Sequence, residues 1–195
     1  MASNSFRVWR TIRARALDEM KNAHASIGGT GRGRRYATQQ VNQAYAVMVA
    51  SQFQGFCRDL HTESVTVLVD FINPPAQVAQ IIRNRFVDGR QLESKNAQPS
   101  SLGSDFGWFG VDFWREVNTL LSDNKAAQRE LAVLNDWRNA IAHQNFKTVS
   151  PVGPPNLTLN QVRKWRRVCN RLAHCFDRVL RVYLQSLSGV SPWPA

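Results

Sequence analysis

The sequence predicts an all-α fold, an up-and-down bundle of five to six helices, from three observations. Apolar residues recur at spacings of three and four through most of the chain, as they do in amphipathic helices. Segments rich in glycine and proline separate these stretches. No segment of useful length alternates apolar and polar residues in the manner of a strand. Because a chain of 195 residues can bury a core without a disulfide or a metal, we expect one helical domain over residues 1–195.

The first expected helix covers about residues 6–26 and ends at residues 28–35, which are too rich in glycine to continue it. We expect this segment to be a basic linker that precedes the core of the bundle, residues 36–188. A long second helix is expected over residues 35–71, because its apolar residues form one stripe: Tyr45, Met48, Val49, Phe53, Phe56 and Leu60.

Breaks in the apolar pattern place the remaining helices. The sequence Asn73-Pro74-Pro75 ends the second helix and starts a third over residues 75–87, because proline is accepted in the first turn of a helix. Residues 88–104 carry Gly, Ser, Asn, Gln and one Pro, and are expected to be a loop. The last three helices are expected from near Asp105, over residues 124–144, and from a capping box of Thr158 and Gln161 to about Ser188.

The net charge is the most unusual property of the chain: 25 Lys and Arg stand against 14 Asp and Glu, which gives +11. Such an excess indicates an anionic partner, most commonly nucleic acid. No apolar run approaches the roughly 20 residues of a membrane-spanning helix, so the sequence excludes an integral membrane protein. The three cysteines form no C-x-x-C pair and fit no zinc spacing. We therefore expect buried thiols in a cytoplasmic protein, with no metal or other cofactor.

One face of the last expected helix concentrates the positive charge. On a helical wheel, roughly one quarter of its circumference holds Arg163, Arg167, Arg171, His174, Arg178 and Arg181. An ordinary solvated face usually mixes both signs, because like charges four residues apart repel each other. Two interpretations remain open, a solvated face and a surface whose arginines bind RNA phosphates. Contacts of the second kind would position RNA without recognising its sequence.

The helix expected at residues 124–144 has mixed polarity. Its apolar side carries Leu131, Leu134, Trp137 and Ile141, and its other side carries Asn135, Asp136, Arg138, Asn139 and His143. Histidine can transfer a proton near neutral pH, because its ordinary pKa is about 6.5. An arginine can neutralise charge that develops on a phosphate. Asn139 precedes His143 by one turn and can orient the imidazole. The alternative is a surface arginine and an ordinary histidine near a helix end.

The segment Asp136–His143 resembles the signature of the HEPN superfamily, the higher eukaryotes and prokaryotes nucleotide-binding domains. That signature is an Arg, often followed by Asn, and a His after four to six intervening positions, in a late helix of a bundle. The resemblance is closest to the RiboL-PSP-HEPN branch, whose members carry a long early helix similar to Phe53–Leu60. That branch often has an acidic residue near the position of Gln54, where this chain departs from it.

This resemblance implies a metal-independent endoribonuclease of the kind found in toxins and phage-defence effectors, acting as a homodimer with a composite active site. His143 would then act as a base on the ribose 2′-hydroxyl or as an acid on the leaving 5′-oxygen, and Arg138 would bind the scissile phosphate. The products would be a 2′,3′-cyclic phosphate and a 5′-hydroxyl, and DNA would resist cleavage. The alternative is a non-catalytic domain that binds RNA or nucleotides, or that pairs with an antitoxin protein.

Three charged residues are further candidates for a supporting role. Arg58 and Asp59, on the second expected helix, either face the same cleft as Arg138 or form a surface ion pair. Asp136 lies two residues before Arg138 on the same polar side of its helix. We group all three with Asn139 and the arginines of the last helix as residues that support the site or contact RNA.

Overall fold

The computed structural model describes residues 1–27, 35–152 and 156–193, and this part of the chain is helical without strands. The prediction of an all-α fold is therefore confirmed. Residues 28–34, most of the expected basic linker, lie outside the described residues. The elements in chain order are α1 (Asn4–Val8), the π-helical turn η1 (Trp9–Arg13), α2 (Ala14–Ile27), α3 (Arg35–Ile72), α4 (Ala76–Asp88), the 3-10 turn η2 (Gln91–Glu93), α5 (Pro99–Gly107), α6 (Phe113–Leu120), α7 (Asn124–Ala142) and α8 (Leu159–Ser188).

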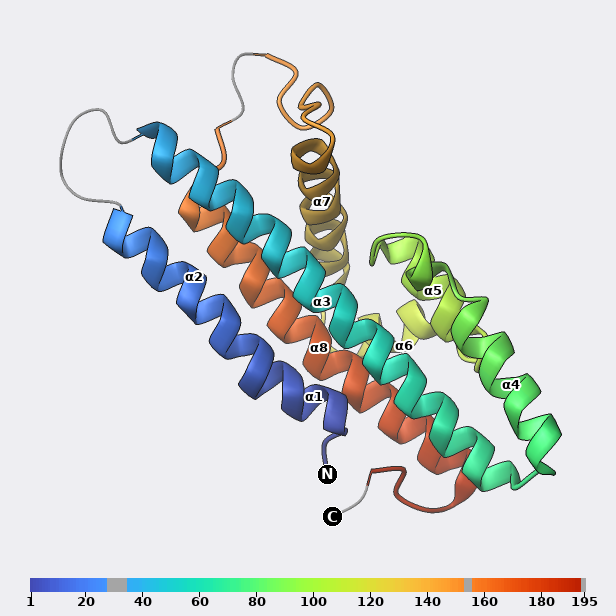
Figure 1. The fold of residues 1–195 in the computed structure, drawn as a ribbon. Helices are drawn as coiled ribbons and strands as arrows, with labels where there is room; N and C mark the ends of the chain where they lie inside the picture. Colours follow the sequence, from blue (N-terminus) through green and yellow to red (C-terminus); the bar gives the residue numbers. More distant parts are fainter. Residues whose placement is uncertain (28–34, 153–155, 194–195) are drawn as a thin grey trace.

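The two longest helices, α3 and α8, lie side by side and form the centre of the bundle (Figure 1). They run in the same direction, whereas α2 and α4 run back along α3 in the opposite direction. Helix α7 packs against both α3 and α8, and α5 and α6 fill the space beside it. Within the described ranges, no helix has both the length and the apolar character needed to cross a membrane.

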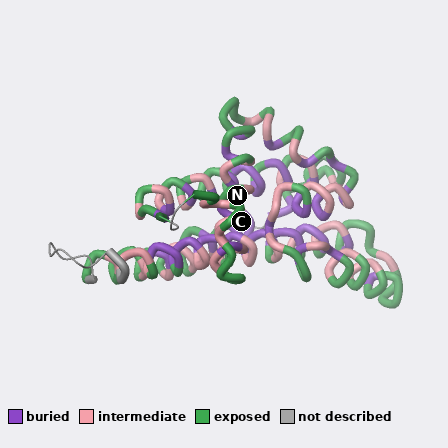
Figure 2. The backbone as a smooth tube through the Cα atoms, turned by 90° about the horizontal axis from the view of Figure 1, so that it is seen from above, coloured by how far each residue is buried: buried purple, intermediate pink, exposed green. Residues whose placement is uncertain are grey.

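Aromatic rings from several helices fill the core. Phe106 of α5 stacks on Phe113 of α6 with ring centroids 4.4 Å apart, and Phe113 meets Phe176 of α8 edge-on at 4.8 Å. Figure 2 shows the buried positions as purple segments along the inner sides of the helices. The apolar stripe predicted for α3 belongs to this core: Tyr45, Val49, Phe53, Phe56 and Leu60 are fully buried, and Met48 is partly buried. All three cysteines are free and buried, as predicted.

Helix α8 begins where the sequence predicts. The side chain of Thr158 accepts a hydrogen bond from the backbone N–H of Gln161 at 3.2 Å, which satisfies one of the free donors at the helix start. The helix ends at Gly189, whose φ of +74° is a left-handed conformation that favours glycine.

The segment 88–104 differs from the expected loop, because it contains η2 and most of α5. Pro99 occupies the first turn of α5, where its missing N–H is not needed. Leu102 and Phe106 lie one turn apart and are fully buried, so packing against the core stabilises this short helix. The prediction of a fourth helix from near Asp105 is also wrong. Asp105 lies inside α5, and the next helix, α6, begins at Phe113.

Two other boundaries differ from the expected ones. The first helix is divided by the π-helical turn Trp9–Arg13 into α1 and α2. Helix α7 ends at Ala142, because Gln144 has a φ of +50° and so cannot continue a right-handed helix. The described residues therefore contain more helical segments, α1 to α8, than the five to six expected.

The turn η2 is fixed to both α5 and α3. The fully buried carboxylate of Asp105 accepts hydrogen bonds from the backbone N–H of Gln91 and of Leu92, each at 2.8 Å. These donors satisfy a charge that would otherwise be costly to bury. Arg90 is also buried, and its Nη1 donates to the backbone oxygen of Arg58 in α3 at 2.9 Å. The segment that follows α4 is thus held on two sides.

His61 of α3 belongs to the same buried polar cluster. Its Nε2 lies 3.2 Å from the backbone oxygen of Asp105, and its Nδ1 lies 3.4 Å from Nη1 of Arg90. Burial, reinforced by the charge of Arg90, lowers the pKa of His61 to about 4. The imidazole is therefore neutral at pH 7.

This lowered pKa predicts that the protein loses stability between pH 7 and pH 5. Unfolded His61 binds a proton below about pH 6.5 and folded His61 only below about pH 4, so stability falls as the pH drops through this window. The expected loss from pH 7 to pH 5 is about 2 kcal/mol. His61→Gln should remove this part of the pH dependence in urea unfolding at the two pH values. An equal loss in the wild type and the variant would contradict the assignment.

Candidate active site

The polar side of α7 faces α5 and the segment before it. On the inner side of α7, Leu131 and Leu134 are buried in the core. Asn135, next along the helix, is also buried, and its Nδ2 donates to the backbone oxygens of Ala97 at 3.1 Å and of Leu131 at 2.9 Å. This hydrogen bond to Ala97 attaches the segment before α5 to α7 and fixes the position of the polar residues that follow Asn135.

Arg138 and His143 line the same surface hollow of about 410 Å³, which we call the Arg138 hollow. On an ideal helix they would be about 140° apart. His143 is the C-cap residue of α7, just beyond its last turn, and its side chain is exposed. The remaining lining residues come from α7 and from the segment before and at the start of α5: Gln91, Ser94, Lys95, Asn96, Gln98, Ser100, Ser101 and Asn139. The structure thus brings the two residues of the predicted motif to one place.

Asn139 connects the two walls of the Arg138 hollow. Its Oδ1 accepts hydrogen bonds from Nδ2 of Asn96 at 2.6 Å and from Nη1 of Arg138 at 3.1 Å. Among the described residues these are the hydrogen bonds of the Asn139 side chain, and neither reaches the imidazole of His143. Asn139 therefore orients the guanidinium of Arg138 and holds the segment before α5.

His143 also lines a second hollow, of about 450 Å³. Its lining residues are Asp136, Asn139, Ala140, His143, Asn145 and Thr148. Asp136 is exposed there, and its Oδ1 lies 3.4 Å from Nε2 of Gln98. His143 and Asn139 line both hollows, and His143 is exposed.

The lining of the Arg138 hollow favours an anion. It contains the cations of Arg138 and Lys95 and several hydroxyl and amide groups, but no Asp or Glu. Backbone and side-chain donors together with a guanidinium are the groups that bind phosphate oxygens. Within the described ranges, no group of three or more His, Cys, Asp or Glu side chains is placed to hold a metal ion.

Arg58 and Asp59 lie outside the lining of the Arg138 hollow. Nε of Arg58 donates to the backbone oxygen of Leu92 at 2.7 Å, so this side chain holds the segment that forms the hollow. Asp59 points to another part of the surface, where it forms an ion pair with Arg13 at 2.7 Å. Gln54 also reaches the segment before α5, because its Nε2 donates to the backbone oxygen of Lys95 at 2.9 Å.

The arginines predicted on the last helix do not line either hollow at His143. Arg167, Arg171 and Arg178 are exposed and Arg163 is half-buried. Arg171 forms an ion pair at 3.4 Å with Asp123, at the start of α7. Arg167 and Arg171 line a separate hollow between α7 and α8. Asp123 and Glu130 line that hollow too, and Arg178 lines a different one. The four arginines therefore lie outside the surface that carries the predicted motif.

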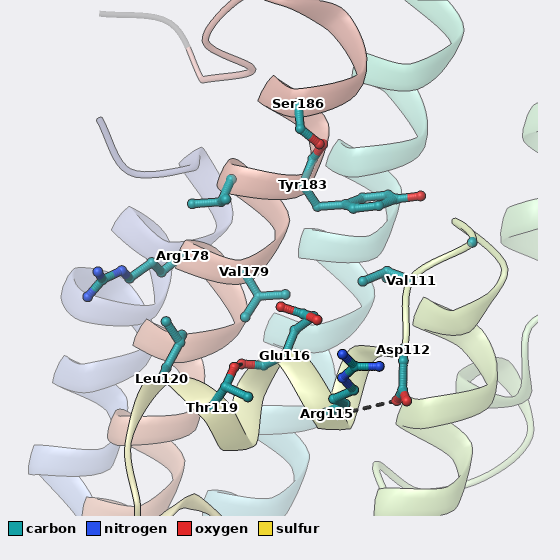
Figure 3. A pocket seen from close by; sticks show the side chains of 12 residues that line it. Val111, Asp112, Arg115, Glu116, Thr119, Leu120, Arg178, Val179, Tyr183 and Ser186 are labelled. Atoms are coloured by element: carbon teal, nitrogen blue, oxygen red, sulfur yellow. Dashed lines mark hydrogen bonds between the residues drawn. The ribbon is translucent and has the colours of Figure 1, made fainter.

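Another hollow, of about 460 Å³, lies between α6 and α8 (Figure 3). Val111, Val179 and Tyr183 give it an apolar floor, and Asp112 and Glu116 place two carboxylates beside it. It contains neither Arg138 nor His143. Its lining also holds the guanidiniums of Arg115 and Arg178, so its charges balance. The lining of the Arg138 hollow, by contrast, has cations and no carboxylate.

Sequence reasoning missed one wall of the Arg138 hollow, the residues from Gln91 to Ser101. The composition of this segment is typical of a loop, and its contacts with α7 join residues about 40 positions apart, such as Asn96 and Asn139. One local signal was present: Pro99 followed by Ser100 and Ser101 is a common helix start.

The structure therefore defines an all-helical domain with an Arg and a His, four residues between them, at an open and cationic surface hollow. The family model described as RiboL-PSP-HEPN matches residues 11–181, and the chain belongs to this family. HEPN domains are generally ribonuclease-like or RNA-binding, and they often dimerise. Neither the comparison with curated proteins nor the comparison with solved structures gives a significant match.

Proposed function

We propose that the protein is a metal-independent endoribonuclease that cleaves RNA at the Arg138 hollow. The observation that carries this proposal is the meeting of Arg138 and His143 in one open hollow whose lining holds cations and no carboxylate. The net charge of +11 supports it, because RNA is a polyanion. The exposed arginines of α8, Arg167, Arg171 and Arg178, would hold the RNA at a distance from the cut.

In the proposed reaction the ribose 2′-oxygen attacks the adjacent phosphorus, and the bond from phosphorus to the 5′-oxygen breaks. His143 takes the proton from the 2′-hydroxyl or gives one to the leaving 5′-oxygen. Arg138, whose guanidinium is oriented by Asn139, neutralises the charge that develops on the phosphate. The products carry a 2′,3′-cyclic phosphate and a 5′-hydroxyl.

A homodimer would complete this site. One imidazole cannot serve at the same time as the base on one side of the phosphorus and the acid on the other. His143 is exposed and lines two hollows, so a second copy of the chain can bring its own His143 to the same phosphate. A two-fold axis near the end of α7 would place the two motifs opposite each other.

The direct test is incubation of the purified protein with total RNA in EDTA. We expect cleavage, 2′,3′-cyclic phosphate and 5′-hydroxyl ends, and no cleavage of DNA of matching sequence, because DNA lacks the attacking 2′-hydroxyl. Cleavage that needs added metal, or cleavage of DNA, would contradict the mechanism. RNA binding with a steep salt dependence but no product would favour the non-catalytic binding domain instead.

We further propose that the ribonuclease is a toxin or phage-defence effector that is kept inactive by an antitoxin protein. Support comes from the family and from the exposure of His143 in an open hollow. Expression in a bacterial host should stop growth, and expression of an Arg138→Ala variant at the same level should not. Equal growth of both cultures while RNA is cleaved in vitro would contradict a toxin role.

A further inference from the structure

The first turn of α5 presents unused hydrogen-bond donors to the Arg138 hollow. Its N-cap residue, Gln98, makes no side-chain capping bond, and Pro99 has no N–H. The N–H of Leu102 bonds to the backbone oxygen of Gln98 at 3.0 Å. Among the described residues the N–H groups of Ser100 and Ser101 have no acceptor. Free N–H groups at a helix start bind anions, helped by the helix dipole.

Ser101 provides independent evidence for a ligand at this place. It is only 2% exposed, yet it lines the hollow, and in the described part of the chain its hydroxyl has no hydrogen-bond partner. Other buried serines are satisfied: Oγ of Ser64 donates to the backbone oxygen of Leu60 at 2.8 Å, and Oγ of Ser5 donates to Glu63 at 2.6 Å. The hydroxyl is not one of the fully enclosed side-chain atoms without a partner in the described residues, so it reaches the hollow. A ligand oxygen there can accept its hydrogen bond.

The charge around these donors selects an anion. Lys95, whose Nζ lies 3.2 Å from Oε1 of Gln91, and Arg138 line the same hollow. No carboxylate lines it to repel a negative group. A phosphodiester has two non-bridging oxygens, which the N–H groups of Ser100 and Ser101 and the hydroxyl of Ser101 can bind together.

We propose that the first turn of α5 is a binding subsite for an RNA phosphodiester that lies next to the one cut at Arg138 and His143. The statement that the bound phosphodiester lies next to the cleaved one rests on the proposed ribonuclease function, because it assumes that cleavage occurs in the same hollow. The subsite makes the enzyme hold at least two successive phosphates, so the substrate is an oligonucleotide and not a dinucleotide.

The test measures binding of a 2′-O-methyl RNA octamer with a 5′-hydroxyl and a fluorescent 3′ end, by fluorescence anisotropy at several salt concentrations. Ser100→Asp places a carboxylate at the exposed second position of α5, where a negative charge suits the helix dipole. We expect about tenfold weaker binding and a salt slope that is smaller by about 0.7. Ser101→Ala should weaken binding by about threefold without lowering the urea midpoint.

Gln77→Asp is the matched control. Gln77 is exposed at the second position of α4, whose N-cap residue, Pro75, also makes no side-chain capping bond. This helix start lies away from α7 (Figure 1), so Gln77→Asp makes the same change of charge without touching the hollow. Its affinity for the octamer should stay within about twofold of the wild type. Equal weakening by Ser100→Asp and Gln77→Asp would overturn the subsite.

A second arm uses the same octamer with a 5′-phosphate. Weaker binding of both octamers to Ser100→Asp supports the phosphodiester subsite, whereas weaker binding of only the phosphorylated octamer would overturn it in favour of a terminal-phosphate site. The octamer has no free 2′-hydroxyl and cannot be cleaved. Its binding therefore tests the subsite separately from the ribonuclease, which is tested by cleavage of unmodified RNA.

Discussion

Replacing His143 by alanine should lower the rate of RNA cleavage by about a thousandfold, because the variant has no group to transfer the proton. The side chain is exposed at the end of α7, and its ring makes no hydrogen bond among the described residues. The free energy of unfolding should therefore change by less than about 0.5 kcal/mol. Initial rates on unmodified RNA in EDTA, with a urea unfolding curve for each protein, measure both quantities.

The matched control for this prediction is His24→Ala, which removes a histidine from α2 and keeps the one in the hollow. It should cleave RNA at the rate of the wild type. Binding of the uncleavable octamer should change little in His143→Ala, because the imidazole acts on the reacting atoms. Cleavage by His143→Ala at the rate of the control would show that the catalytic assignment is wrong.

Replacing Asp105 by alanine should lower the free energy of unfolding by about 3 kcal/mol. The variant leaves the backbone N–H groups of Gln91 and Leu92, each 2.8 Å from the carboxylate, without an acceptor in a buried place. The turn η2 would then lose two of its hydrogen bonds to α5, while Nε2 of Gln91 would still donate to Oγ of Ser104 at 3.0 Å. The turn η2 leads into the segment that forms one wall of the Arg138 hollow. The rate of RNA cleavage should therefore fall by more than the fraction of folded protein does.

Asp112→Ala is the control for this second prediction. Asp112 is exposed and accepts a hydrogen bond from the backbone N–H of Arg115 at the start of α6, outside the hollow. Loss of an exposed helix cap costs about 1 kcal/mol, and cleavage should be unaffected. A destabilisation by Asp105→Ala no larger than that of Asp112→Ala, measured by urea unfolding, would contradict the role of the buried carboxylate.

Local signals in the sequence predict much of the fold. The stripe of α3 and the start of α8 follow from helical periodicity and from Thr158, and both are confirmed. Pro99 shows where such signals are ambiguous, because proline is common both in loops and in the first turn of a helix. Only the burial of Leu102 and Phe106 against the core decides in favour of a helix.

The candidate site can be predicted only in part, because only some of its residues are close together in the sequence. Arg138 and His143 are close in the sequence, so the motif could be found without the structure. The opposite wall could not, because it depends on contacts between distant segments, such as the hydrogen bond from Asn96 to Asn139. Those contacts also give Asn139 partners other than the imidazole. Buried polar contacts of this kind, including Asp105 with η2, leave no periodic pattern in the sequence.

The link between Asn96 and Asn139 also bears on the order of events during synthesis. Residues 91–101 are synthesised before Arg138 and His143, so the residues of the first wall leave the ribosome before those of the second. The hydrogen bonds from Asn135 to Ala97 and from Asn96 to Asn139 can form only after α7 has emerged and packed. A nascent chain that ends before α7 therefore lacks Arg138, His143 and the completed hollow, so the proposed cleavage of RNA could begin only after α7 has been synthesised.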